Sequence, residues 1–123
     1  MNKNKLTGLT IVLVFGAIIS FIMFTDKRLE SNGILLNART TEWIMGANMS
    51  MDLKYEFYYE GRKIIGSNAT GNYRGNPLFV NKYFPVIYDL KYERSELLVQ
   101  PANFKKYNLV FPDSLNWVLQ YIK

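Results

Sequence analysis

The sequence predicts a single N-terminal transmembrane helix followed by a small, mainly β domain that ends in an amphipathic helix. Three observations carry this prediction. An apolar segment without charges occupies residues 6–25, polar and apolar residues alternate over residues 51–59, and the apolar spacing becomes helical after Pro112. A chain of this length has one core, so we expect residues 34–123 to form one domain of about five antiparallel strands, a curled sheet or a barrel.

The apolar segment reads LTGLTIVLVFGAIISFIMFT and runs for 20 residues without a charge. At about 1.5 Å of rise per residue, such a helix spans about 30 Å, the thickness of a bilayer core. The alternative is a cleavable signal peptide with residues 1–5, MNKNK, as its charged region. The segment is longer than the apolar core of a typical signal peptide and no A-x-A site follows it, so we expect an uncleaved signal anchor.

The orientation of this anchor is not fixed by charge, because two lysines precede it and Lys27 and Arg28 follow it. A short tail is easier to leave inside the cell. We therefore expect residues 1–5 in the cytoplasm and residues 26–33 as a polar linker. The protein would be a single-pass protein of the inner (cytoplasmic) membrane, with its globular domain in the periplasm or outside.

The first three strands are predicted by alternation and by turns. Residues 34–45, ILLNARTTEWIM, have the composition of a strand, and residues 46–48 form a turn. Leu53, Tyr55, Phe57 and Tyr59 then fall on one face of a half-buried strand. The Glu60-Gly61 pair predicts a tight hairpin turn, with either Ile64 or Ile65 returning to the core.

The second half of the domain is less regular. Residues 71–83 contain two glycines and a proline and are predicted to form a loop or a short irregular helix. Residues 84–92 predict a fourth strand, in which Pro85 requires an edge position or a strand start. Residues 93–101 predict a fifth strand. Residues 113–122 predict an amphipathic helix with Asp113 or Ser114 as its N-cap. Its apolar face would consist of residues at helical spacing: Leu115, Val118, Leu119 and Ile122.

A family resemblance accompanies these elements over residues 33–100. The order YEFYYEGRKIIGS, FPVIYD and SELLV resembles a pattern of small membrane-anchored bacterial envelope proteins of unknown function. The matching positions are Tyr55, Phe57, Gly61, Ile65, Gly66, Pro85, Val86, Tyr88, Asp89, Ser95, Leu97 and Leu98. The resemblance implies a compact five-stranded barrel or curled sheet beside one or two membrane helices, without a shared enzymatic activity. The link DLKYERS departs from the pattern because it lacks two prolines.

Composition narrows the possible chemistry. The chain contains no His and no Cys, so it lacks the usual general base, thiol nucleophiles and the commonest metal ligands. Asp52, Glu56 and Glu60 are candidates for a pair of carboxylates that catalyses hydrolysis. Strand alternation, however, places Glu56 on the solvent face and Glu60 in a turn. The net charge of +5 is scattered and does not form the stripe typical of nucleic-acid binding. We expect no enzyme, no cofactor, no bound metal and no nucleic-acid partner.

Two functions remain open at this point. The first is a non-enzymatic interaction or accessory module, such as an immunity-type protein, that binds another envelope protein. The loop at residues 71–83 or an exposed sheet edge would form the contact, with Tyr73, Arg74, Phe79 and Tyr83 as the candidate residues. The alternative is a module that binds a lipid or glycan on an aromatic sheet face. The sequence leaves the oligomeric state open.

Overall fold

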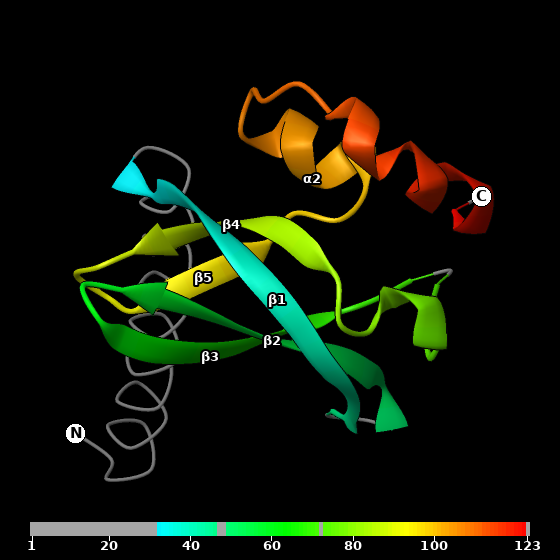
Figure 1. Ribbon diagram of the computed structural model, residues 1–123, viewed down its shortest axis with the longest axis horizontal. Coiled ribbons are helices and arrows are strands. Elements are labelled where there is room, and N and C mark those ends of the chain that lie inside the picture. The colour runs from blue at the N-terminus through cyan, green and yellow to red at the C-terminus, as the bar shows by residue number, and fades with distance from the viewer. Residues whose placement is uncertain (1–31, 47–48, 72, 123) are drawn as a thin grey trace, which may run out of the picture.

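Strand β1 is the centre of a five-stranded antiparallel sheet in the computed structural model, which describes residues 32–46, 49–71 and 73–122 (Figure 1). The strand order is β3-β2-β1-β4-β5, so β3 and β5 are the edges. The strands are β1 (Ile34–Met45), β2 (Met51–Tyr59), β3 (Arg62–Ala69), β4 (Tyr83–Asp89) and β5 (Arg94–Leu97). The sheet curls into a half-barrel, which confirms the predicted curled sheet of five antiparallel strands.

The β2–β3 hairpin follows the alternation in the sequence. Leu53, Tyr55 and Phe57 point into the core and are almost completely buried. Both turn residues have positive φ, 49° at Glu60 and 76° at Gly61, as a type I′ turn requires. This turn has the twist of the strands that it joins, so it fixes their register.

Two short helices follow the sheet and lie together on one side of it (Figure 1). Helix α2 (Pro101–Lys106) occupies the end of the segment predicted as a fifth strand, and β5 stops at Leu97. That prediction was wrong at its boundary: Leu98 and Val99 are fully buried but lie beyond the last residue of β5, and an apolar run does not distinguish a buried strand from a buried connecting segment.

The C-terminal helix is a 3₁₀-helix, η3 (Asp113–Tyr121), with Pro112 as its N-cap residue. A period of three residues aligns Leu115, Val118 and Tyr121 toward the core, whereas Leu119 is exposed. The predicted position of the helix is therefore right, but its N-cap lies before the predicted Asp113 or Ser114, and the predicted α-helical face is wrong at Leu119.

Pro85 lies in β4, which is an interior strand, and this corrects the expectation of a sheet edge. Its carbonyl oxygen accepts a hydrogen bond from the backbone N–H of Leu98 at 2.8 Å, so residue 85 faces β5. Because β5 ends at Leu97, the missing N–H of the proline faces the point where regular pairing stops.

The segment between β3 and β4 is a turn followed by the 3₁₀-helix η2 (Pro77–Phe79), as predicted. The Asn76 side chain caps this helix by accepting a hydrogen bond from the backbone N–H of Leu78 at 3.0 Å. Phe79 is fully buried and packs against Trp117 and Tyr121 of η3, with ring centroids 5.0 and 5.8 Å away. The segment is thus attached to the C-terminal helix by aromatic packing.

The predicted tail at residues 1–5, the predicted transmembrane helix at residues 6–25 and most of the linker at residues 26–33 lie outside the described residues. Within the part that is described, no helix has the length and apolar character needed to cross a membrane.

Candidate functional site

The outer face of the sheet carries a row of side chains that crosses four strands. In the strand register Ile65 lies opposite Glu56, Glu56 opposite Arg39, and Arg39 opposite Tyr83. Side chains alternate between the two faces of a sheet, so these four share one surface. Tyr58 and Lys63 form a neighbouring pair on β2 and β3. We call the following residues the outer-face cluster: Arg39, Glu56, Tyr58, Lys63, Ile65 and Tyr83.

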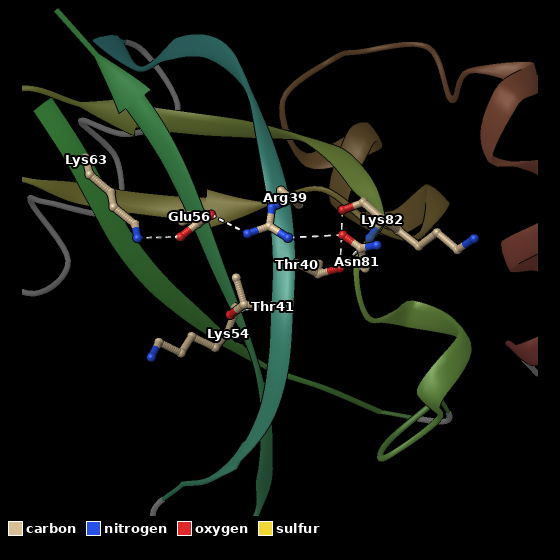
Figure 2. Close-up of polar contacts among 8 residues, drawn as sticks. All are labelled: Arg39, Thr40, Thr41, Lys54, Glu56, Lys63, Asn81 and Lys82. Atoms are coloured by element: carbon tan, nitrogen blue, oxygen red, sulfur yellow. Dashed lines mark hydrogen bonds and ion pairs between the residues drawn. The ribbon is translucent and has the colours of Figure 1, made fainter. Parts of the chain in front are cut away.

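Glu56 joins the two cations of this cluster (Figure 2). Arg39 Nη2 donates a hydrogen bond to Glu56 Oε1 at 2.6 Å, and Lys63 Nζ lies 2.9 Å from Oε2. The hydrogen bond from Arg39, followed by that from Lys63, lowers the pKa of the Glu56 carboxyl. Two cations and one anion leave these three residues with a net charge of +1.

Arg39 is held from both sides. Its Nη1 donates a hydrogen bond to Asn81 Oδ1 at 3.1 Å, while its Nη2 binds Glu56 (Figure 2). Asn81 lies in the turn before β4 and has positive φ, a conformation that Asn tolerates well. The guanidinium is therefore fixed between β2 and that turn.

Thr40, which is completely buried, sets the position of this turn. Its hydroxyl donates to the carbonyl oxygen of Phe79 and accepts from the backbone N–H of Lys82 at 2.9 Å. Its own backbone N–H and carbonyl bind Lys82 and Asn81, each at 2.8 Å. Tyr83 is the residue after Lys82, so the bonds from the buried Thr40 to Lys82 also fix the backbone position of Tyr83.

The apolar members of the cluster are open to solvent. Tyr83 is 63% exposed, Tyr58 is 62% exposed and Ile65 is 57% exposed. By contrast, α2 and the segment after it approach the outer surface near β4 and β5, where Lys106 and Tyr107 bind Glu96. The cluster lies on the part of the face that these segments leave uncovered.

The four residues predicted as partner contacts separate into one buried pair and two exposed residues that lie apart. Tyr73 and Phe79 are buried, at 4% and 0% exposure, and their rings stack with centroids 4.5 Å apart. They belong to the core, because the loop attaches to the domain through these rings. Arg74 is exposed and donates to the carbonyl oxygen of Met49 at 2.7 Å. Tyr83 is part of the outer-face cluster, which neither Tyr73 nor Arg74 joins.

The carboxylates do not form a paired acid–base site in the described structure. Glu56 is bound by Arg39 and Lys63, Asp52 accepts from the Ser50 hydroxyl at 3.3 Å, and Glu60 lies in the hairpin turn. The described residues also contain no group of three or more His, Cys, Asp or Glu side chains arranged to hold a metal ion. Burial raises the pKa of Tyr55 and that of Tyr73 to about 12, which keeps both hydroxyls protonated near neutral pH.

Comparison of the chain with protein-family models, curated proteins and solved structures finds no match. What the protein does is therefore inferred from the chemistry of its own surface.

Sequence reasoning did not bring Arg39, Tyr58, Lys63 and Ile65 together. Part of the signal was present, since a two-residue turn at Glu60-Gly61 places Tyr58 opposite Lys63 and Glu56 opposite Ile65. The register between β1 and β2 could not be predicted in the same way. A bulge between Thr40 and Glu42 shifts the pairing of β1 with β2, and no sequence feature indicates it.

Proposed function

We propose that the chain is a single-pass membrane protein whose β domain is a non-enzymatic module that binds another protein at the cell envelope through the outer-face cluster. The observation that carries this proposal is the row Ile65–Glu56–Arg39–Tyr83, in which exposed aromatic and aliphatic groups surround an arginine held in place. The partner surface would present acidic or hydrogen-bond-accepting groups to a cluster with a charged centre of net +1.

The composition of the cluster favours a protein partner. Tyr and Arg are enriched where protein interfaces contribute most binding energy, because a tyrosine ring buries apolar area while its hydroxyl keeps a hydrogen bond. Two exposed tyrosines and one arginine occur here on neighbouring strands. Isolated exposed apolar residues are ordinary, whereas three of them on the same face around one ion-paired centre favour a binding surface.

The held arginine supports the same proposal. A free arginine side chain loses rotamer freedom on binding, and that loss weakens association. Arg39 has already lost this freedom to Glu56 and Asn81. A partner carboxylate or carbonyl that approached the guanidinium would therefore meet a donor whose direction is fixed.

The alternative ligand, a lipid or glycan on the aromatic sheet face, has less support. Tyr55, Phe57 and Tyr88 are at most 2% exposed and form the packed core. A ligand would have to displace this core to reach the rings. The inward-facing aromatic residues of β2 are therefore explained by folding, as the alternation of the strand indicated.

The membrane anchor of the proposal rests on residues 6–25, which carry no charge over 20 residues. We place this anchor in the inner membrane, with residues 1–5 in the cytoplasm and the β domain in the periplasm or outside. A short linker at residues 26–33 would keep the outer-face cluster near the membrane, where another envelope protein could reach it.

Affinity capture of the full-length protein from native membranes tests the proposal. We expect one partner at a stoichiometric ratio from the unmodified protein and at least a tenfold loss from the variant Tyr58→Ala/Tyr83→Ala, because each truncated aromatic anchor costs about 1–2 kcal/mol or more. Met45→Ala is the matched control, since Met45 is highly exposed but lies outside the cluster. Equal recovery from both variants would refute the outer-face cluster as the contact.

A further inference from the structure

An apolar groove lies between the start of β1 and the segment that joins α2 to η3. It has a volume of about 210 Å³, and the described residues that line it are all uncharged: Leu35, Pro85, Phe104, Leu109, Val110 and Pro112. Leu35 is 54% exposed and Val110 is 90% exposed. The fold therefore leaves two large apolar side chains in water beside each other in one groove.

Val110 is held in this exposed position by the residues on both sides of it. Before it, the backbone N–H of Leu109 donates to the carbonyl oxygen of Phe104 at 2.9 Å, and Asn108 has a positive φ of 57°. These are the features of a Schellman motif, which ends α2. After it, the ring of Phe111 packs edge-on against the ring of Phe104, with centroids 5.3 Å apart. The exposure of Val110 is thus fixed by the fold.

Charge does not select what the groove binds. Lys105 follows the lining residue Phe104 on α2, and Asp113 follows the lining residue Pro112 at the start of η3, so these two charges cancel. An occupant gains from the burial of apolar surface instead. The groove differs in this respect from the outer-face cluster, whose charged centre has a net charge of +1.

The groove lies where the chain enters the β domain from the proposed anchor. Leu35 is the second residue of β1, and only residues 26–33 separate the apolar segment at residues 6–25 from that strand. This linker of eight residues reaches at most about 29 Å when fully extended. A domain of about 90 residues has a radius of gyration of about 12 Å, so the linker is no longer than the domain is wide. A bilayer that holds the anchor therefore stays within reach of the groove.

We propose that the apolar groove docks on the membrane, with Leu35 and Val110 inserted at the boundary between lipid headgroups and acyl chains. The proposal rests on the anchor of the proposed function and goes beyond it, because it gives the β domain a lipid contact of its own. Arg39 lies on the same face of β1, four residues after Leu35. At about 3.3 Å per residue this is about 13 Å, so docking also holds the outer-face cluster close to the headgroups.

Spin labelling of the full-length protein in vesicles of pure phosphatidylcholine tests the contact with lipid. The chain has no Cys, so Val110→Cys and, separately, Met45→Cys each give a single site for a nitroxide. Met45 is the matched position, because it is 67% exposed at the opposite end of β1. We expect the nitroxide at residue 110 to lie about 5–10 Å into the lipid boundary, where oxygen relaxes it more than a water-soluble nickel chelate does, and the reverse at residue 45. Stronger relaxation by the chelate at residue 110 would overturn the docking.

The apolar character of the contact is tested with the label at residue 110. Immersion of the nitroxide should persist in about 1 M salt, because the Debye length is then only about 3 Å. Leu35→Ser should weaken the docking equilibrium about fivefold or more, since it removes apolar carbons that enter the lipid. Leu78→Ser, at a residue that is 49% exposed in η2, should leave it unchanged. A folded Leu35→Ser variant with full immersion, or immersion lost in salt, would contradict apolar docking.

Alkaline carbonate extraction of the same vesicles separates the docking from the anchor on which it rests. A transmembrane helix stays in the bilayer under this treatment, whereas a surface contact alone does not hold a protein there. We expect the full-length protein to remain with the vesicles. Retained protein with a water-exposed nitroxide at residue 110 would refute the docking and leave the anchor intact. Release of the protein would refute the anchor, and the docking with it.

Discussion

Glu56 links the stability of the sheet to the geometry of the outer-face cluster. Its two carboxylate oxygens bind different cations, Arg39 from β1 and Lys63 from β3, while Glu56 itself lies on β2. The Glu56 side chain thus links its own strand to both neighbouring strands. If the carboxylate is neutralised, the strands keep their backbone pairing but Arg39 loses one of the two groups that orient it.

The first prediction concerns this carboxylate and pH. The pKa of Glu56 in the folded protein is lowered by Arg39 and Lys63, whereas an unfolded Glu titrates near about 4.3. Its stabilising contribution is therefore fully present above about pH 4.3 and is lost as pH falls through the lower folded value. We expect Glu56→Gln to reduce the fall in melting temperature between about pH 6 and about pH 3.

Circular dichroism melts at several pH values check this prediction. Glu60→Gln is the matched control, because it removes an exposed carboxylate from the hairpin turn and should keep the wild-type pH dependence. The ion pairs of Glu56 would be irrelevant to stability if Glu56→Gln and Glu60→Gln gave the same curve.

The β2–β3 hairpin shows how closely one element is packed against the core. Gly66 lies opposite Tyr55, and a Cβ added at residue 66 would come within 2.5 Å of the Tyr55 ring. The ring is fully buried and its hydroxyl lies 2.7 Å from the Ser95 hydroxyl, so it cannot move without losing that bond. The glycine is needed at this position for space, since its φ is not in the left-handed region.

The second prediction follows from this packing. Gly66→Ala should lower the free energy of unfolding by about 1–3 kcal/mol, as overpacked cores usually do. Gly71→Ala is the control: an added Cβ there meets nothing within 4 Å. That variant should be neutral or more stable by up to about 1 kcal/mol, because alanine restricts the unfolded chain. Urea unfolding followed by tryptophan fluorescence measures both, and equal stability of the two variants would contradict the packing.

The third prediction concerns the attachment of η2 to η3. Phe79→Ala should lower the free energy of unfolding by about 3–5 kcal/mol, because it removes a fully buried ring and leaves a cavity. Leu78 is 49% exposed, so Leu78→Ala should change stability by about 1 kcal/mol or less. Urea unfolding measures the stability of both variants. A Phe79→Ala variant that kept its stability and lost only partner binding would contradict the core role of Phe79 and would support its role as a contact residue.

For the molecule as a whole, the sequence predicted what depends on local patterns. β1 occupies residues 34–45 as predicted, and the hairpin turn lies at Glu60-Gly61, because alternation and a Gly-containing turn are local signals. The structure differs from the prediction where tertiary packing, and not a local pattern, determines the conformation. Phe79 lies in the short helix η2 between β3 and β4 and is nevertheless core, and the period of three in η3 brings Tyr121 onto Phe79.

The candidate site was predicted only in part for the same reason. Tyr83 was named from its loop position, but its neighbours come from three other strands. Their meeting depends on the β1 bulge and on the bonds that Thr40 makes to the turn before β4. Neither feature has a local sequence signature, so Arg39 and Lys63 could not be assigned to the cluster from the sequence.

The docking role of the outer-face cluster is tested most directly by photo-crosslinking in native membranes. A photoreactive amino acid replaces Tyr83 in the full-length protein and, in a separate variant, replaces Leu119, which is exposed on η3 and does not belong to the cluster. We predict one discrete adduct from position 83, absent from position 119 and lost when Arg39→Ala and Tyr58→Ala are added. The same adduct from position 119, or no protein adduct from position 83, would contradict the proposed docking surface.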